Sequence, residues 1–229
     1  MKTLTAAVAS AAIASMGAAN ASVIFTEMFE APILGSSWDV FDIVGDFLTV
    51  DGAGIELHRS GTVVSAYEGG QYIELDSDFQ VTPYPGEGSN TGMAAFVGLV
   101  AGATYEISYA YQPRTASAGD NGIEVAVGAL TDGGPGARSF SESAAVGQAD
   151  STTALQSGWE VFTHTFTATS GDNAILFRAF GTENELGGFL DSVTISTMEA
   201  DAVPAPAGGI LLASGLAALF SRRAIRTAN

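Results

Sequence analysis

The chain has no cysteine, and it has almost no basic residues outside its two ends. The absence of cysteine excludes disulfide bonds and every metal or redox site that is built on thiolates. Of the eight basic residues, Lys2 lies near the N-terminus and Arg222, Arg223 and Arg226 lie near the C-terminus. The part between therefore has four arginines against all 25 acidic residues, a formal charge of 4 − 25 = −21. Such a surface repels phosphate backbones and anionic lipid headgroups, which argues against nucleic acid and peripheral membrane partners.

Sequence signatures of catalysis are also missing. The chain has no G-x-S-x-G or H-E-x-x-H motif, no P-loop and no dinucleotide fingerprint, and it has only two histidines. His58 alternates with Glu56 on the expected polar face of a strand, which predicts an exposed residue without a role. His164 points to the same side of its predicted strand as Phe162 and Phe166, which predicts a position at the margin of the core. Catalysis by a Ser-His-Asp triad is therefore not indicated.

The N-terminus has the three parts of a secretory signal peptide. Lys2 supplies a positive charge, the stretch 4–16 is apolar and rich in alanine, and residues 19–21 read Ala-Asn-Ala. This order predicts a signal peptide over residues 1–21 that is cleaved before Ser22. The alternative, a buried N-terminal helix, would normally carry polar residues on its solvent face.

The C-terminus combines a short proline motif, an apolar run and a basic cluster. Val203, Pro204, Ala205 and Pro206 precede an apolar run that begins at Ala207. The stretch 203–220 has a helical length of about 27 Å, which nearly spans a bilayer core of about 30 Å. We predict a linker over residues 201–206, a transmembrane helix over 207–221 and a basic cytoplasmic tail over 222–229. The alternative is a buried C-terminal helix.

The residues between the two ends predict a single all-β domain over 22–200. Short runs of β-branched and aromatic residues alternate with clusters of Gly, Asp, Asn, Ser and Pro, and no long stretch has a helical period. This pattern is typical of an antiparallel jelly-roll β-sandwich. The predicted strands are Val23–Phe29, Trp38–Ile43, Phe47–Val50, Ile55–Arg59, Gln71–Leu75, Gly92–Leu99, Thr104–Tyr111, Gly122–Leu130, Trp159–Ala168, Ala174–Gly181 and Phe189–Thr197.

Alternation within the strands assigns the two faces of the sheets. Tyr105, Ile107, Tyr109 and Tyr111 share one side of their strand, which predicts a buried row. In the stretch 71–76 the same rule places Ile73 and Leu75 inward, and Tyr72, Glu74 and Asp76 outward. The glycine-rich stretches 81–91 and 131–156 have weak patterns and are predicted to be long loops. Ligand contacts on a sandwich are often found on such loops.

Several sequence stretches of the domain together resemble those of secreted bacterial galactose-binding-like jelly-roll modules. They are the stretches 55–61, 68–76, 109–114 with 120–125, and 186–193. The resemblance implies a non-enzymatic carbohydrate-binding or cell-surface module with a structural calcium ion. It also implies that an acid after a phenylalanine of the first strand shares this ion with an acid near the last strand. These positions correspond to Glu30 and Asp191, and Glu27 and Asp76 are weaker candidates.

Asp191 is also notable from its position alone. Its parity matches Val193 and Ile195, so its side chain is expected to point toward the core, where an unpaired carboxylate is costly. A calcium ion is one compensation, because oxygen ligands in an acidic exported protein favour it. Protonation, a bond to Arg178 or bonds to backbone amides are the alternatives.

The C-terminal segment resembles a PEP-CTERM sorting signal. The features that carry this resemblance are residues 203–206, the apolar run with its Gly208-Gly209 pair, and the cluster that includes Arg222 and Arg223. Ala205 stands where the usual motif has glutamate. The resemblance implies an exosortase-type partner in a Gram-negative bacterium. It also implies a single-pass intermediate in the inner membrane, and a final location at the cell surface or in the extracellular matrix.

Candidate ligand residues are aromatic or polar groups that are expected near strand ends or loops. Sugar rings stack on aromatic rings, and their hydroxyl groups need donors and acceptors. The candidates are Trp38, Tyr67, Tyr84, Tyr111 and Arg114. The predicted function is polysaccharide binding without catalysis. The alternatives are a structural acidic matrix protein with no glycan site, and a glycan hydrolase that uses Glu74 and Asp76 as an acid–base pair.

Overall fold

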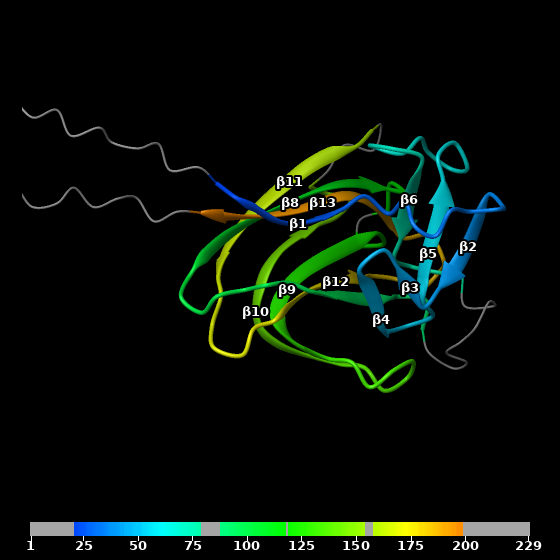
Figure 1. The fold of residues 1–229 in the computed structure, drawn as a ribbon. Helices are drawn as coiled ribbons and strands as arrows, with labels where there is room; N and C mark the ends of the chain where they lie inside the picture. The colour runs from blue at the N-terminus through cyan, green and yellow to red at the C-terminus, as the bar shows by residue number, and fades with distance from the viewer. Residues whose placement is uncertain (1–20, 79–87, 118, 154–157, 199–229) are drawn as a thin grey trace, which may run out of the picture. The chain divides into compact units, whose positions relative to one another are not determined.

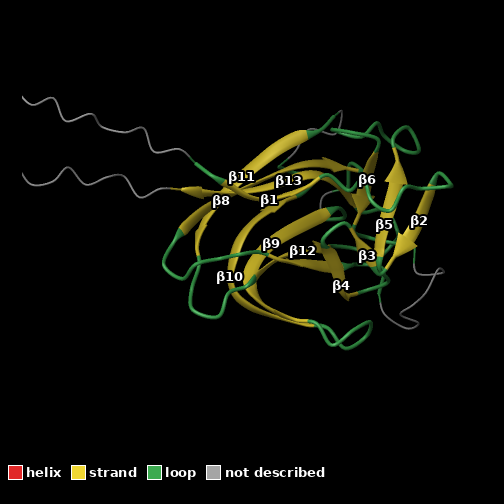
Figure 2. Ribbon diagram, viewed as in Figure 1, coloured by secondary structure: helices red, strands yellow, loops and turns green. Residues whose placement is uncertain are grey.

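The computed structural model describes residues 21–78, 88–117, 119–153 and 158–198. These residues belong to one compact unit, Ala21–Met198. They form strands and turns, and this part of the chain contains no helix (Figure 2). Accordingly, none of the described residues lies in a helix long and apolar enough to cross a membrane. Tyr84, almost all of the predicted signal peptide and the whole predicted sorting segment lie outside the described residues.

Two antiparallel sheets face each other and form a sandwich (Figure 1). The first sheet contains, in spatial order, β11 (Glu160–Thr167), β8 (Thr104–Pro113), β13 (Gly188–Met198), β6 (Gln71–Glu74), β5 (Ile55–Arg59) and β2 (Trp38–Phe41), and β1 (Val23–Glu27) pairs with β13. The second sheet contains β10 (Ser139–Ala149), β9 (Gly122–Thr131), β12 (Ala174–Phe180), β7 (Gly92–Phe96), β4 (Phe47–Asp51) and β3 (Ile43–Val44). The predicted all-β, two-sheet sandwich is confirmed.

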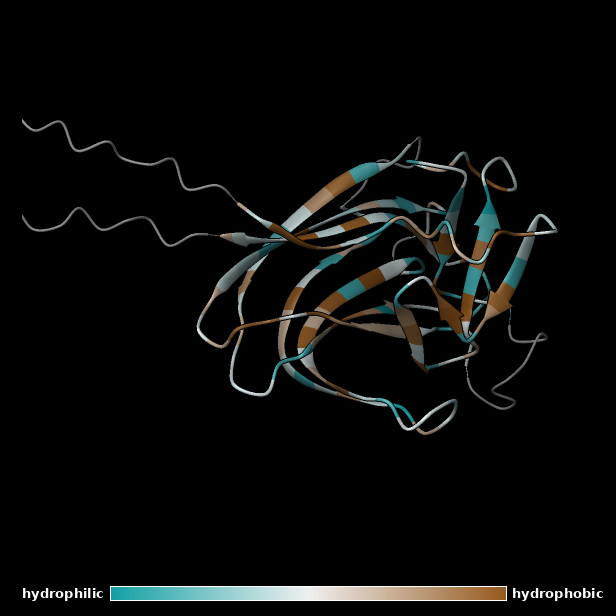
Figure 3. Ribbon diagram, in the orientation of Figure 1, coloured by the Kyte–Doolittle hydropathy of each residue, from teal (hydrophilic) through white to brown (hydrophobic). Residues whose placement is uncertain are grey.

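The core lies between the sheets and is built from alternate residues of each strand. Hydrophobic and polar residues alternate along the strands of both sheets (Figure 3). On β8 the four predicted inward residues are all at most 1% exposed, which confirms their assignment. Across the sandwich, the Tyr109 ring of the first sheet lies 5.2 Å from the Phe177 ring of the second, and Phe177 lies 5.8 Å from Phe47. The burial of these large rings holds the two sheets together.

The prediction of a loop over residues 131–156 was wrong, because β10 lies within it. This strand is rich in serine, alanine and glycine and lacks a row of large apolar residues. It is the edge strand of the second sheet, and its pairing with β9 contains two register shifts. Its backbone hydrogen bonds, rather than a buried side-chain face, keep it in the sheet, and alternation does not reveal such a strand.

The predicted strand Trp38–Ile43 is divided in the structure. Residues 38–41 form β2 of the first sheet, whereas Ile43 begins β3 of the second sheet. The chain thus passes from one layer to the other near Asp42. A continuous β-favouring sequence does not indicate such a change of sheet.

The outward residues of β5 and β6, and Asp76 just after β6, lie on the predicted side of the sheet but are buried, and only the exposure predicted for His58 was wrong. His58 is 2% exposed, Tyr72 and Glu74 are 0% exposed, and Asp76 is 1% exposed. Their parity is as expected, since Leu57 and Ile73 belong to the core between the sheets. Loop residues cover this outer face: the Trp159 ring lies 5.8 Å from the Tyr72 ring. The first sheet therefore buries polar side chains on its outer side.

Candidate functional site

The outer face of β5 and β6 carries a buried polar cluster. Glu56 and Glu74 lie directly opposite each other on the paired strands, and His58 lies opposite Tyr72. The Nε2 atom of His58 is 2.8 Å from Oε1 of Glu56 and 3.2 Å from Oε2 of Glu74. Two carboxylates at directly opposed positions repel each other unless positive charge lies between them. His58 occupies that position.

Arg114 completes the charge balance of Glu74. Its Nη1 atom donates to both carboxylate oxygens of Glu74, at 2.8 and 2.7 Å, and the amide of Gly187 donates to Oε1 at 2.7 Å. Arg114 directly follows β8, and Gly187 directly precedes β13. Three segments that are distant in sequence therefore converge on one fully buried carboxylate.

The pKa values in the cluster reflect a competition between burial and charge. Burial opposes the charged form of His58, but the contacts with Glu56 and Glu74 outweigh it and raise the pKa of the imidazole. Burial also raises the pKa of Glu74, against the lowering effect of His58 and Arg114. The prediction that His58 is an exposed bystander was therefore wrong, because its strand face is covered.

A pocket of about 200 Å³ opens above this cluster. It is lined by Trp38, Glu56, His58, Thr62, Val63, Asp78, Arg114 and Glu185. Two of the predicted ligand residues, Trp38 and Arg114, thus lie in one pocket although 75 residues separate them in sequence. The pKa of Glu185 is raised by burial and by the charges of Asp78, Asp76 and Glu56. The pocket is strongly acidic.

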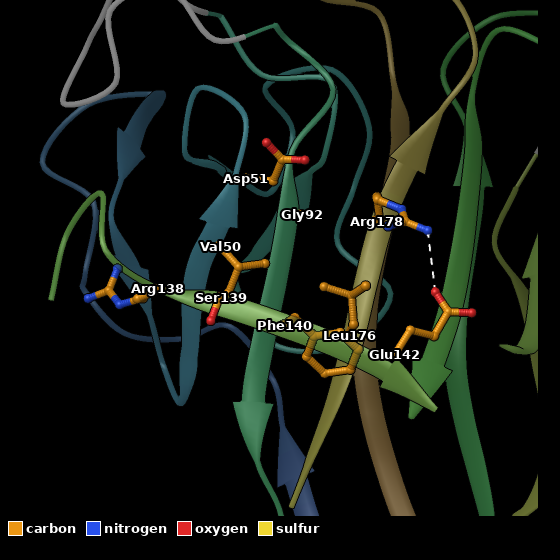
Figure 4. Close-up of a pocket in the computed structure, with 9 residues that line it drawn as sticks. All are labelled: Val50, Asp51, Gly92, Arg138, Ser139, Phe140, Glu142, Leu176 and Arg178. Carbon is orange, nitrogen blue, oxygen red and sulfur yellow. Dashed lines mark ion pairs between the residues drawn. The ribbon is translucent and has the colours of Figure 1, made fainter. Parts of the chain in front are cut away.

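A second depression of about 270 Å³ lies on the outer face of the second sheet (Figure 4). We call it the β10 groove. It is lined by Val50, Asp51, Gly92, Arg138, Ser139, Phe140, Glu142, Leu176 and Arg178. Leu176 belongs to a small apolar cluster with Ala94 and Ala126, against which Val50 and Phe140 pack. The outward side chains of β7, β9 and β12 are mostly small, so the outer surface of the sheet is depressed there.

Phe140 approaches the sheet because Gly128 leaves room for it. A Cβ atom at position 128 would lie 3.0 Å from Cζ of Phe140 and 2.2 Å from the carbonyl oxygen of Ser141. A larger residue would thus displace both the aromatic ring and the β10 backbone. The glycine allows the aromatic side chain to form one wall of the β10 groove.

Each end of the β10 groove has an arginine that is paired with carboxylates. Arg138 contacts Asp42 at 2.6 Å and Asp132 at 2.9 Å, and its side chain is only 3% exposed. Arg178 pairs with Glu124 and also with Glu142, whose Oε2 is 3.6 Å away (Figure 4). The Arg178 side chain is 42% exposed. Arg138 therefore anchors the groove, whereas Arg178 presents donors to solvent.

The other predicted ligand residues are not brought together. Tyr111 is 0% exposed and donates its hydroxyl to the carbonyl of Asn121 at 2.6 Å, so the prediction that it contacts a ligand was wrong, whereas its predicted place in the buried row is confirmed. Tyr67 is 46% exposed, and its ring lies 6.3 Å from that of Trp159.

Sequence reasoning missed Phe140 because it lies in the predicted loop. It also missed Arg178. This residue lies two positions after Leu176 on β12, so alternation could have placed both side chains on the outer side of the sheet.

The two predicted calcium ligands Glu30 and Asp191 are held by the same turn. Oδ2 of Asp191 accepts hydrogen bonds from the amides of Tyr67 and Glu68 at 2.9 and 3.1 Å. Oε1 of Glu30 accepts from the amides of Gly70 and Gln71 at 2.6 and 3.1 Å. Asp191 is fully buried, and this burial raises its pKa to about 6 despite the amide bonds.

This arrangement favours bonds to backbone amides among the alternatives for Asp191. Backbone amides compensate its charge, and Arg178 does not, because Arg178 pairs with Glu124 on the other sheet. The carboxylate of Glu68 also lies nearby, since its Oε2 is 3.4 Å from Oγ of Ser192. Carboxylate oxygens of Glu30, Glu68 and Asp191 are the donor type that Ca²⁺ prefers.

Glu27 and Asp76, the weaker metal candidates, anchor turns. Glu27 accepts from the amides of Met28 and Phe29 through Oε1 and from the amide of Asp46 through Oε2. Asp76 accepts through Oδ2 from the amides of Asn184 and Leu186. These hydrogen bonds tie both side chains to the backbone of the turns.

Comparisons with known proteins give similarity of fold only. No family model and no curated protein matches the chain. Among solved structures, a family 22 carbohydrate-binding module of Clostridium thermocellum Xyn10B matches with a TM-score of 0.48 and 12% identity, over 76% of this chain and 94% of that one. The K1 cleaved adhesin domain of Lys-gingipain from Porphyromonas gingivalis matches at 0.47 and 15%, over 76% and 98%.

The CBM22-1 xylan-binding domain of Paenibacillus barcinonensis Xyn10C is a third match, with a TM-score of 0.40 and 14% identity, over 79% of this chain and 97% of that one. At TM-scores below 0.5, these matches identify no site residue in this chain.

Replacement of Arg114 by methionine tests the buried pair. The variant leaves Glu74 buried without its cationic partner, so we expect the free energy of unfolding to fall by about 3 kcal/mol in urea titrations. The matched variant Arg178→Met removes a partly exposed pair and is expected to cost less than about 1 kcal/mol. Equal losses in the two variants would show that the Glu74 pair does not stabilise the fold.

Proposed function

We propose that the chain is an exported, non-enzymatic module that binds a neutral polysaccharide in the β10 groove. The observation that carries this proposal is a groove in which the partly exposed apolar side chains of Val50 and Phe140 lie between polar groups at both ends. Sugar rings place their apolar faces against aromatic and aliphatic side chains, and their hydroxyl groups exchange hydrogen bonds with charged groups at the rim. Phe140 and Val50, which are both partly exposed, provide the first kind of contact, and Arg178 and Glu142 provide the second.

The charge of the molecule favours a neutral ligand over an anionic one. The part of the chain between the two ends carries 21 more acidic than basic residues. An anionic polysaccharide would meet this repulsion at every approach, whereas a neutral chain would not. The two arginines of the groove do not reverse this preference, because both are paired with carboxylates.

Arg178 and Glu142 suit hydroxyl recognition in particular. A guanidinium offers five donors in a fixed plane, and its pairing with Glu124 and Glu142 fixes the orientation of these donors. The carboxylates supply acceptors beside them. A sugar hydroxyl, which is both donor and acceptor, can bond to the two kinds of group at once.

The groove can be tested by glycan binding. We expect the full chain to bind one or more neutral polysaccharides on an array that also contains anionic ones. Phe140→Ala and Arg178→Gln are each expected to weaken that binding by about ten-fold, measured by calorimetry, since each removes roughly 1.4 kcal/mol of contact energy. Trp38→Ala, in the other pocket, is the control and is expected to bind as the unchanged chain does.

The outcome separates the candidate functions. Loss of binding in Trp38→Ala but not in Phe140→Ala would move the ligand to the pocket above His58. No binding to any polysaccharide would favour the structural acidic matrix protein. Release of sugar products that disappears in Glu74→Gln would favour the glycan hydrolase.

Export and sorting form a second part of the proposal, supported by residues 1–21 and 201–229 of the sequence. The signal peptide would direct the chain across the inner membrane, and the apolar segment would hold it there. An exosortase-type enzyme would then process the segment that follows Val203-Pro204-Ala205-Pro206. The destination would be the cell surface or the extracellular matrix.

Cell fractionation tests the sorting proposal. In a Gram-negative host with an exosortase, we expect the chain to be shortened at its C-terminus and released from the inner membrane. The double variant Arg222→Gln, Arg223→Gln weakens the cytoplasmic anchor and is expected to reduce processing. Equal processing in a host without an exosortase would contradict the proposal.

A structural calcium ion between Glu30, Glu68 and Asp191 is the third part of the proposal. The ion would bind only the folded chain, so at about 100 times its Kd it adds roughly 2.7 kcal/mol of stability. We expect the melting temperature to rise by about 5 °C with Ca²⁺ and to fall again with a chelator. Asp191→Asn should lose this response, and the surface control Asp39→Asn should keep it. An unchanged melting temperature on chelation would remove calcium from the proposal.

A further inference from the structure

The cluster on the outer face of β5 and β6 has the geometry of a metal site, separate from the β10 groove. We propose that Glu56, His58 and Glu74 bind one divalent transition-metal ion of the zinc class. The candidate ligand atoms of these three residues all lie within 4.8 Å of one another. All three residues are at most 5% exposed. Three protein ligands that leave a further coordination position open are typical of zinc sites at which small molecules bind.

His58 itself points to a missing partner. The Nε2 atom lies close to both carboxylates, yet neither ring nitrogen makes a hydrogen bond of acceptable geometry, and both nitrogens are buried. Buried polar atoms of this kind are rare unless an ion or water occupies the gap. The imidazole ring is also held in place, because it stacks on Tyr72 at 5.2 Å and meets the edge of Phe189 at 6.0 Å.

The two carboxylate ligands are oriented by groups outside the cluster. Arg114 and the amide of Gly187 hold Glu74, and the amide of Asp78 donates to Oε2 of Glu56 at 2.7 Å. Oε1 of Glu56 and Oε2 of Glu74 remain directed at His58. Hydrogen bonds to metal ligands fix the ligand geometry in this way and raise metal affinity.

Charge and donor type select the ion. Four carboxylates, those of Glu56, Glu74, Asp78 and Glu185, line or underlie the pocket, against the single guanidinium of Arg114. A divalent cation offsets part of this excess of negative charge. An imidazole nitrogen beside carboxylate oxygens favours zinc and similar ions over calcium or magnesium, which prefer oxygen alone.

The pocket gives a bound ion access to other molecules. Glu56 and His58 line the pocket of about 200 Å³, so the open side of the ion would face it. Trp38 and Thr62 are also in its wall. A small ligand with a carboxylate or paired hydroxyl groups can reach such an ion, which gives the pocket a use that does not depend on polysaccharide binding in the groove.

Zinc titration of the full, tag-free chain tests this inference. We expect calorimetry to give one Zn²⁺ per chain, and Co²⁺ substitution to give visible absorption bands of a site with nitrogen and oxygen ligands. His58→Gln and Glu56→Gln should each lower Zn²⁺ affinity by more than the roughly 10-fold that loss of a supporting hydrogen bond costs. The matched controls are His164→Gln, the other histidine, and Glu106→Gln, an exposed acid on β8, and both should bind Zn²⁺ unchanged.

Three results would overturn the inference. They are no stoichiometric Zn²⁺ binding, equal binding by His58→Gln and the unchanged chain, and Ca²⁺ binding at the same site with the affinity of Zn²⁺. Circular dichroism of each variant identifies any that fails to fold. If His58→Gln does not fold, the proton NMR spectrum of the unchanged chain with Co²⁺ decides, because an imidazole bound to Co²⁺ gives strongly shifted ring resonances. Absence of those resonances would then refute the site.

Discussion

The contact between aromatic rings of the two sheets is the constraint on which the rest of the molecule depends. Without disulfide bonds, the sheets are joined by burial alone, and Tyr109 and Phe177 are central to that contact. Because β12 turns Phe177 inward, alternation turns Leu176 and Arg178 outward, where they line the β10 groove. The same packing therefore builds the core and determines which side chains of the second sheet can meet a ligand.

The outer faces of the two sheets differ in the side chains that they carry and in what covers them. On its outer face the second sheet has a small buried cluster of alanine and leucine side chains, against which the partly exposed Val50 and Phe140 pack beside paired charges. The first sheet covers its outer face with loops and so removes Glu56, His58 and Glu74 from water. Burial of two opposed carboxylates is costly unless positive charge compensates it, and Arg114 is the only cation of fixed charge in that pocket's lining. This imbalance is the physical basis for a metal ion there.

The excess of acidic residues links the three proposed sites. It disfavours anionic polysaccharides in the groove, and it favours divalent cations near clustered carboxylates. The part of the chain between the two ends has no lysine, and the turn formed by residues 67–71 shows another way to compensate acidic side chains, since its backbone amides bind both Glu30 and Asp191. The amide donors of one turn therefore hold both carboxylates.

The sequence alone determined the fold class, most strand positions and the inward row of β8, because alternation with period two is a local property. It also predicted the two ends of the chain, which rest on composition. Only the tertiary structure decided that β10 is a strand and that Phe140 and Arg178 share a groove. It also decided that Glu56, His58, Glu74 and Arg114 meet under covering loops. The physical reason is that parity tells which side of a strand a residue faces, whereas the packing of distant segments decides what covers that side.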